Sequence, residues 1–328
     1  MNKHIQLTAV IPDEHQGQRL DKTLATLFSD FSRSQLKTWM DNGYVLVNGK
    51  AQKPRDKVLG GETVVIDALL EEREDWKGQA LILTIIYEDD DILVINKPVG
   101  QVVHPAAGNA DSTLVNALLY HHPDLACLPR AGLVHRLDKE TSGLLVIAKT
   151  LSAHKHLVEQ LQSREMGRRY IAIVCGTLTG GGKVNEPIGR HPLQRVKQAV
   201  VHNGKPAITH YRVVERFAEH TLIRVQLETG RTHQIRVHMA HVRHPLLGDP
   251  LYGRRFALPK KASEELILAL RAFKHQALHA ESLTLFHPST LKEMTFEAPI
   301  PEDFQHLITL LREHKSTFVI PAKAGIHL

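Results

Sequence analysis

The sequence has few of the features that mark secreted or membrane proteins. Only two cysteines occur in 328 residues, Cys127 and Cys175, and they stand far apart and form no motif. No run of about 18 apolar residues is present, so no transmembrane helix is expected. The N-terminus, MNKHIQLTAVIPDE, lacks the apolar core of a signal peptide. These absences predict a cytoplasmic protein in a reducing compartment.

Motifs of several common enzyme classes are also missing. The sequence has no Walker A motif, no Gly-x-Gly-x-x-Gly and no Gly-x-Ser-x-Gly, so phosphoryl transfer, nicotinamide chemistry and serine hydrolysis lose support. Its 22 histidines form no His-Glu-x-x-His, and there is no Cys-x-x-Cys. Because metal sites need ligands at such spacings, no metal is expected.

Positive charge is in excess and is clustered. The formal net charge is +6, and basic residues gather in the segments GRRY, GRHPLQRVKQ, TGRTHQIRVH and YGRR. Clusters of this kind suit contacts with the phosphates of a nucleic acid. Aromatic residues make up only 5% of the chain, which argues against extensive stacking of bases on aromatic platforms.

The length and the changes in composition predict two folded units. We expect an N-terminal extension at 1–16, a small unit at 17–66, an acidic linker at 67–80, a large unit at 81–313 and a loose, disordered C-terminal extension at 314–328.

The small unit combines two helices with a hairpin. Apolar residues recur at helical spacing in LDKTLATLF, and SRSQLKTWMDNG predicts a second helix in which Ser32 and Gln35 form a capping box. The Asn48-Gly49 pair predicts a hairpin in YVLVNGKAQK. This pattern resembles the S4 RNA-binding domain, which implies RNA contacts by Arg33 and Lys37. On charge alone, a small αβ domain with solvated lysines also fits.

The large unit mixes strands with helices in no regular βαβ order. LILTIIYEDDDILVINKP, RRYIAIVCG and TLIRVQLETG read as strands, whereas STLVNALLYHH, residues 151–166, RTHQIRVHMAHV and residues 302–313 read as helices. This order predicts an α+β fold, a mainly antiparallel mixed β-sheet with flanking helices and loops, beside the small αβ domain.

A charged turn in LVHRLDKETSGLLVIAKT stands directly before an apolar strand at 144–148. Asp138 on its own fits a turn aspartate that bonds backbone amides. Arg136 fits that interpretation less well, because a charge beside a buried strand must be paired or must face a cleft.

Three segments together resemble the RluA/RluD-type ribosomal RNA pseudouridine synthases: GLVHRLDKETSGLLVIAKT, RRYIAIVCG and TGRTHQIRVHMAHVRHPLLGDPLYG. The resemblance begins at YEDDDILVINKPVGQVVHP and runs to about residue 311, and with the S4-like start it is similar to the RluD branch. It implies an isomerase that converts uridine to pseudouridine in large-subunit (23S) ribosomal RNA, at several positions of one hairpin loop near the subunit interface. The uracil leaves its ribose through N1 and rejoins through C5, so no cofactor is implied.

The resemblance also implies the roles of individual residues. Asp138 matches the essential aspartate, which acts as nucleophile or as base. Tyr170 matches the tyrosine that stacks on the target base, and Arg236 the basic residue that pairs with the aspartate. Arg136 matches the arginine that enters the RNA helix when the base leaves it. Further RNA contacts are implied for His135, Arg231 and Thr141, and Arg231 can instead cap the following helix.

Two other functions stay open at this point. A non-catalytic RNA-binding or ribosome-assembly factor could keep the same fold, although intact Asp138, Tyr170 and Arg236 argue against it. A nucleoside-processing hydrolase with an aspartate nucleophile would release free uracil. We expect ribosomal RNA or a pre-ribosomal particle as the partner, no membrane association, and a monomer.

Overall fold

The computed structural model describes residues 3–28, 31, 33–70, 76–105, 109, 111–194, 196–253 and 259–316. Within these ranges, none of the helices combines the length and the apolar composition that crossing a membrane requires. The predicted N-cap Ser32 lies outside the described residues, as does most of the predicted C-terminal extension. The last helix of the chain continues to Ser316.

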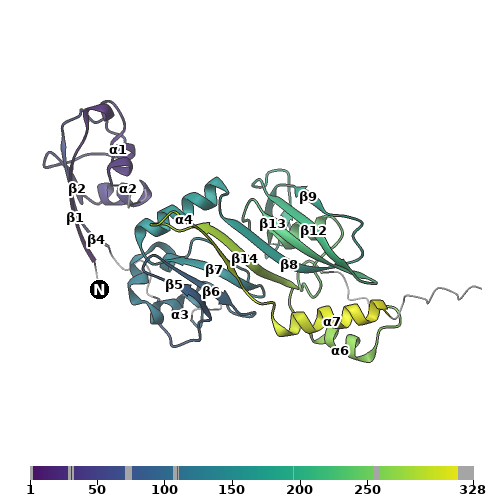
Figure 1. The fold of residues 1–328 in the computed structure, drawn as a ribbon. Helices are drawn as coiled ribbons and strands as arrows, with labels where there is room; N and C mark the ends of the chain where they lie inside the picture. The colour runs from purple at the N-terminus through teal and green to yellow at the C-terminus, as the bar shows by residue number, and fades with distance from the viewer. Residues whose placement is uncertain are drawn as a thin grey trace, which may run out of the picture.

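The N-terminal unit is a small antiparallel sheet with two helices on one face (Figure 1). Its strand order is β1-β4-β2-β3, with β1 (Lys3–Val10), β2 (Val45–Val47), β3 (Lys50–Ala51) and β4 (Thr63–Leu70). The helices are α1 (Leu20–Leu27) and α2 (Arg33–Asp41), with the short 3-10 helix η1 (Asp13–His15) before them.

The predicted helices and hairpin of this unit are confirmed. Asn48 and Gly49 both have positive φ, +47° and +74°, as the tight turn between β2 and β3 requires. The structure adds one feature that the sequence patterns did not indicate. β1 pairs with β4 along its full length, so residues from the predicted extension and from the start of the predicted linker belong to this sheet.

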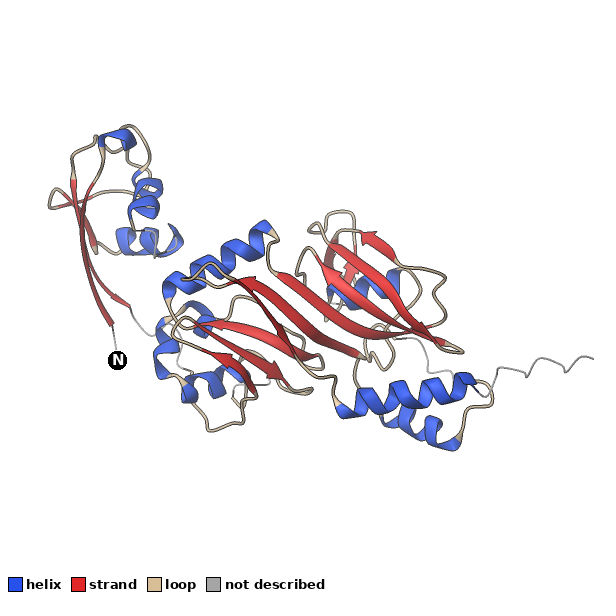
Figure 2. Ribbon diagram, viewed as in Figure 1, coloured by secondary structure: helices blue, strands red, loops and turns tan. Residues whose placement is uncertain are grey.

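The large unit is built on a nine-stranded sheet that runs through the middle of the molecule (Figure 2). The strand order is β5-β6-β7-β14-β8-β13-β12-β9, and β15 pairs with β14. Among the described strands of this sheet, only the β7–β14 pair is parallel, which confirms the predicted mainly antiparallel α+β fold. The strands are β5 (Ile85–Glu88), β6 (Ile92–Lys97), β7 (Ser142–Ala148), β8 (Gly167–Cys175), β9 (Gly182–Asn185), β12 (Ile208–Arg216), β13 (His220–Leu227), β14 (Leu278–Phe286) and β15 (Glu293–Glu297).

Helices and a small ribbon surround this sheet. The ribbon pairs β10 (Ile188–Arg190) with β11 (Gln198–Val200). The helices are α3 (Leu114–His121), η2 (Pro123–Cys127), η3 (Pro129–Gly132), α4 (Leu151–Ser163), α5 (Gln234–His241), α6 (Glu264–Ala272) and α7 (Glu302–Ser316). Leu151, at the start of α4, also packs against the core of the N-terminal unit.

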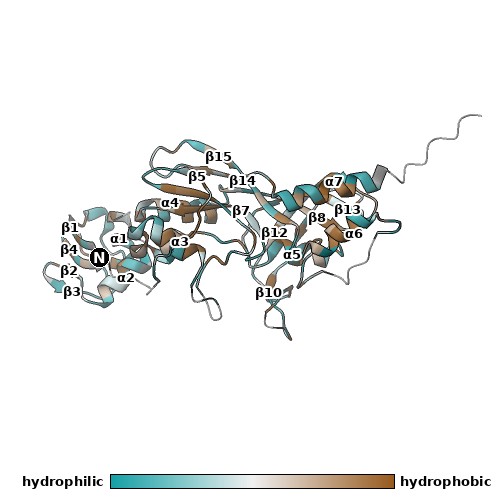
Figure 3. Cartoon of the chain, turned by 90° about the horizontal axis from the view of Figure 1, so that it is seen from below, coloured by the Kyte–Doolittle hydropathy of each residue, from teal (hydrophilic) through white to brown (hydrophobic). Residues whose placement is uncertain are grey.

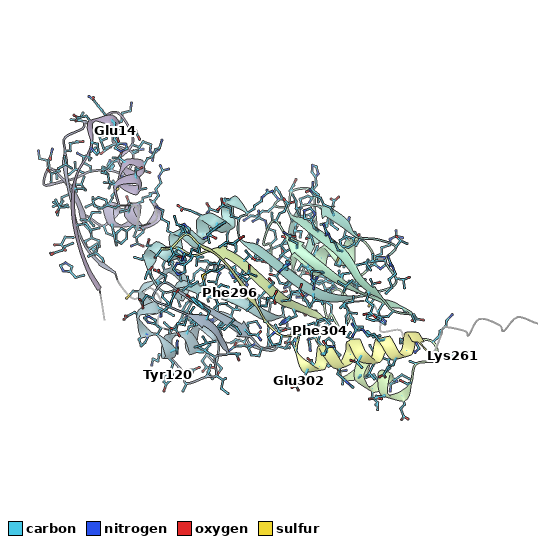
Figure 4. All side chains as sticks on the ribbon, viewed as in Figure 1. Glu14, Tyr120, Lys261, Phe296, Glu302 and Phe304 are labelled. Atoms are coloured by element: carbon cyan, nitrogen blue, oxygen red, sulfur yellow. The ribbon has the colours of Figure 1, made fainter. Side chains whose placement is uncertain are left out.

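Strand β8 separates two cores, as its alternating pattern predicts. Tyr170 and its neighbours at every second position pack with β13, α3 and α5, whereas Ile171 and Ile173 pack with α6 and α7. Figure 3 shows hydrophobic and hydrophilic residues alternating around α7, which fits a helix with one buried face. Phe304, labelled on α7 in Figure 4, is only 1% exposed and contacts Phe273 after α6.

Candidate active site

One cleft brings together the residues predicted to act on the substrate in the large unit. Its volume is about 390 Å³, and its walls come from the turn before β7, from β8, from α4 and from the loop that leads into α5. The predicted residues that line it are Asp138, Tyr170, Arg236, Arg136, His135, Arg231 and Thr141. The two predicted in the N-terminal unit, Arg33 and Lys37, are not among its lining residues.

The position of the charged turn is fixed by a close approach between two strands. Gly143 pairs with Ala280 where β7 meets β14, and a Cβ atom at Gly143 would lie 2.4 Å from the Ala280 carbonyl oxygen. Gly143 has a φ of +114°, which side chains rarely allow. The amide of Thr141 donates to the Asp138 carbonyl at 3.0 Å, which closes the turn immediately before the strand.

A buried lysine, Lys97, is hydrogen-bonded to the same turn. Lys97, at the end of β6, is fully buried, and its Nζ donates to the carbonyls of Pro98, Gln101 and Lys139 at 2.7–3.1 Å. Burial lowers the pKa of Lys97 to about 8, although the nearby carboxylates of Glu140 and Asp138 oppose this shift. The lysine therefore joins the loop after β6 to the residue that follows Asp138.

Asp138 forms a direct ion pair with Arg236. The Nη1 of Arg236 donates to Asp138 Oδ2 at 2.9 Å, and the Asp138 side chain remains 19% exposed toward the cleft. Arg236 is only 4% exposed, although it would otherwise be read as an ordinary surface residue of α5. A carboxylate held in this way is oriented and is also accessible to a substrate.

A second aspartate fixes the guanidinium from its other side. Asp249 accepts from Arg236 Nε at 2.8 Å and from Nη2 at 2.9 Å, and its side chain is fully buried. Its Oδ1 also accepts from the backbone amides of Leu251 and Tyr252. Burial acts against the charges of Arg236 and Asp249, but their mutual hydrogen bonds and attraction outweigh it, so the pKa of Arg236 is raised and that of Asp249 is lowered.

His233 and Tyr252 complete the surroundings of this pair. His233 Nε2 lies 3.9 Å from Asp138 Oδ1, and its Nδ1 is hydrogen-bonded to the Tyr252 hydroxyl at 2.8 Å. Burial lowers the pKa of His233. The guanidinium carbon of Arg236 lies 5.1 Å from the centre of the Tyr252 ring, a cation–π distance.

The remaining predicted residues differ in how far they are free to contact a ligand. Tyr170 is 6% exposed, and burial raises the pKa of its hydroxyl. Arg136 is exposed at the rim. His135 Nε2 accepts from the Val146 amide at 3.2 Å, which ties the turn to β7. Thr141 is 2% exposed and accepts from Gln276 at 2.9 Å.

Arg231 lies on the loop before α5. Its guanidinium Nε donates to the Pro206 carbonyl at 3.1 Å, and its backbone amide donates to the Gln234 side chain at 2.9 Å. The N-cap of α5 is His233, whose side chain forms no capping bond, and Arg231 lies two residues before it. The Arg231 side chain is exposed beside the cleft.

In the N-terminal unit, Arg33 and Lys37 both expose their side chains on α2. Arg33 is also paired, because its Nη2 donates to the buried Asp21 carboxylate at 2.8 Å.

Sequence reasoning missed four side chains of this site, namely Lys97, His233, Asp249 and Tyr252. Lys97 is a charge at the end of an otherwise apolar strand, and the other three lie within the family-like segment TGRTHQIRVHMAHVRHPLLGDPLYG. Among the described residues, no group of three or more His, Cys, Asp or Glu side chains is arranged to hold a metal ion.

Comparison with known proteins identifies the family. The model of RNA pseudouridylate synthase matches residues 91–241, and the S4 domain model matches residues 18–64. Ribosomal large subunit pseudouridine synthase D of Pseudomonas aeruginosa is 55% identical over 97% of this chain and 100% of its own length. The chain belongs to the RNA pseudouridylate synthase family.

Other pseudouridylate synthases agree with this membership. The synthase D of Escherichia coli strain K12 is 55% identical over 96% of this chain and 98% of its own length. The solved structure of human RNA Pseudouridylate Synthase Domain Containing 4 aligns with a TM-score of 0.53 and 28% identity, over 70% of this chain and 93% of that chain. Human RNA Pseudouridylate Synthase Domain Containing 1, at 23% identity and a TM-score of 0.52, shows the same fold. The family resemblance of the sequence and the predicted S4 domain are thus confirmed.

Proposed function

We propose that this protein converts specific uridines of large-subunit ribosomal RNA to pseudouridine, with Asp138 as the catalytic carboxylate. The observation that carries the proposal is the Asp138–Arg236 pair, which leaves an oriented carboxylate 19% exposed in the cleft that Tyr170 also lines. Near-full-length relatives named ribosomal large subunit pseudouridine synthase D support the choice of substrate. The proposal extends to several target uridines in one hairpin loop near the subunit interface.

The reaction breaks the bond between N1 and C1′ of the uridine and forms a bond between C5 and C1′. A proton leaves C5 and another is gained at N1, so the nucleotide keeps all its atoms and no cofactor is consumed. Asp138 starts the reaction as an ionised carboxylate, either by attack on the nucleotide or as a base. Arg236 orients this carboxylate because its guanidinium donates directly to Asp138 Oδ2.

The target base must leave its helix, since C1′ and C5 of a stacked nucleotide are out of reach of a side chain. Tyr170 supplies a ring in the cleft on which the uracil stacks. Arg136, exposed at the rim, fills the gap in the RNA stack with its planar guanidinium. His135, Thr141 and Arg231 line the path of the RNA around the turn.

The N-terminal S4 domain adds contacts with the RNA outside the cleft. Arg33 and Lys37 on the exposed side of α2 contact RNA phosphates, while the large unit performs the chemistry. The proposed enzyme acts as a monomer. Ribosomal RNA as substrate supports action in the cytoplasm.

The test compares wild type, Asp138→Asn and Asp124→Asn on unmodified large-subunit RNA. Asp124 is an exposed aspartate of η2 outside the cleft lining and serves as the matched control. Chemical mapping should show pseudouridine with wild type and the control and none with Asp138→Asn, whose RNA affinity should stay within a few-fold of wild type. Pseudouridine formation by Asp138→Asn at the normal rate would exclude Asp138 as the catalytic residue.

The same samples separate the two other functions. Release of free uracil by the wild-type protein, measured by chromatography, would indicate a hydrolase. RNA binding by wild type without any pseudouridine would indicate a non-catalytic factor. Mapping of the ribosomal RNA from cells that lack the protein then identifies the uridines that it modifies.

A further inference from the structure

Arg168 is a buried cation in the wall of the cleft. It lies on β8 two residues before Tyr170, so both side chains leave the strand on the same face. Both line the cleft, and Arg168 is only 7% exposed.

No anion in the described part of the chain neutralises Arg168. Among the described residues, none forms an ion pair or a hydrogen bond with its guanidinium, and its Nε is buried without a hydrogen-bond partner. Two neighbouring arginines differ in this respect, since Arg236 binds two carboxylates and Arg169 donates to Ser282 at 3.0 Å. A buried charge without a partner is unfavourable, so its retention next to an open cleft indicates a ligand that supplies the missing anion.

The described residues around Arg168 leave room for its guanidinium and contribute no negative charge to it. Gly230 lies beside it, and a Cβ atom at Gly230 would come within 2.6 Å of Arg168 Nη1. Burial together with the charge of Arg168 lowers the pKa of His135 to about 3, so this histidine is neutral at physiological pH. The carboxylate in the same cleft, Asp138, is bound to Arg236 instead.

We propose that Arg168 binds a phosphate next to the flipped uridine and so anchors the nucleotide whose base lies against Tyr170. This inference rests on the proposed function. A phosphate is the anion that every nucleotide carries, whereas the carbonyl oxygens of uracil are neutral and do not balance a buried cation. The planar fork of a guanidinium also matches the geometry of phosphate oxygens.

The first test measures RNA affinity and protein stability together in Arg168→Met. Loss of a charge-assisted contact with phosphate should weaken RNA binding by about 10- to 100-fold. The melting temperature should stay the same or rise, because an unpaired buried charge has been replaced by an apolar side chain. Arg169→Met, which removes the same charge one residue away, should change affinity much less, and Arg168→Lys should restore part of it.

The second test uses a synthetic RNA around one mapped target uridine, with a methylphosphonate in place of the phosphate on its 5′ or its 3′ side. At one of these two positions the neutral linkage should weaken wild-type binding by about tenfold or more and should have no further effect in Arg168→Met. Gly230→Ala displaces the guanidinium without removing it, so this variant should likewise lose the difference in affinity between the normal RNA and the RNA with the methylphosphonate.

These experiments separate the two proposals. If wild type forms no pseudouridine in this RNA, the proposed function fails. If it forms pseudouridine but Arg168→Met binds RNA as tightly as wild type, only the role of Arg168 is wrong. Additive losses from Arg168→Met and from the methylphosphonate at both positions would also overturn it, and so would a marked drop in the melting temperature of Arg168→Met.

Discussion

Replacement of Asp249 by asparagine should destabilise the protein more strongly than an isosteric change normally does. Asp249 accepts four hydrogen bonds: two from Arg236 and one each from the amides of Leu251 and Tyr252. If the asparagine oxygen keeps the two amides, its NH₂ group faces Arg236 Nε, and two donors oppose each other. If the side chain flips, the NH₂ group faces three donors.

The expected magnitude follows from the burial of the pair. Arg236 is 4% exposed and the Asp249 side chain is fully buried, so water cannot replace the lost carboxylate oxygen. Breaking a buried ion pair from one side costs about 3–5 kcal/mol, and we expect about 3 kcal/mol because the backbone bonds survive. Pseudouridine formation should also slow by more than tenfold, because the guanidinium that orients Asp138 becomes free to tilt.

The assay uses the positions of the two tryptophans. Trp39 lies in the core of the N-terminal unit, and Trp76 packs against the core of the large unit. In a Trp39→Phe background, the fluorescence of Trp76 during urea unfolding therefore reports on the large unit. Asp303→Asn is the matched control, because its exposed pair with His275 should contribute less than about 1 kcal/mol.

A double-mutant cycle tests the cause of the loss. Arg236→Gln combined with Asp249→Asn leaves no unpaired charge between the two positions, so the double variant should be less destabilised than the sum of the single variants by about 2 kcal/mol. The double variant should still form pseudouridine more than tenfold more slowly than wild type. A loss in Asp249→Asn no larger than that in Asp303→Asn, or strictly additive losses in the cycle, would refute this account of the site.

Three further predictions concern the turn, its histidine and the N-terminal unit. Gly143→Ala should lower the free energy of unfolding by about 3 kcal/mol or more in the same urea assay, since its Cβ would lie 2.4 Å from the Ala280 carbonyl oxygen; an unchanged unfolding midpoint would contradict the close approach. The pKa of His135 is about 3 in the folded protein and has its ordinary value in the unfolded chain, so the unfolded chain binds more protons as the pH falls below about 6.5. Wild type should therefore lose about 2 kcal/mol of stability between pH 8 and pH 5 that His135→Gln does not lose, and parallel pH profiles of the two proteins would count against it. Lys37→Ala should weaken RNA binding with little effect on stability, and the slope of log K against log salt concentration should become shallower by about 0.7–0.9. Arg33→Ala should also reduce stability because it removes a partner of Asp21. Equal slopes for wild type and Lys37→Ala would exclude the phosphate contact.

Elements encoded by short stretches of the sequence could be predicted without knowledge of the fold. Alternation in β8 placed Tyr170 on the face opposite Ile171, and the Asn48-Gly49 pair defined the N-terminal hairpin. Ile235 and Met239, four positions apart in the predicted helix RTHQIRVHMAHV, share one helix face and lie in the core. Such patterns depend on neighbours within a few positions of the chain, so periodicity alone is sufficient to predict them.

Which charges form pairs depends on the tertiary structure. Asp138 and Arg236 lie 98 positions apart, and only the family resemblance indicated that they meet. No local pattern showed that Asp249 would bind Arg236 from the far side, or that Lys97 would hold the turn through three carbonyls. The physical reason is that the environment of a buried charge is set by distant segments of the chain.

The difference is clearest for two neighbouring arginines of β8. In the sequence Arg168 and Arg169 are equivalent members of one basic cluster. The fold buries the first beside an open cleft, where no described residue supplies an anion, and leaves the second exposed, where it donates to Ser282. Strand alternation predicts that the two side chains point to opposite faces, but which face carries the cleft is fixed only when β13, α4 and α5 pack around β8.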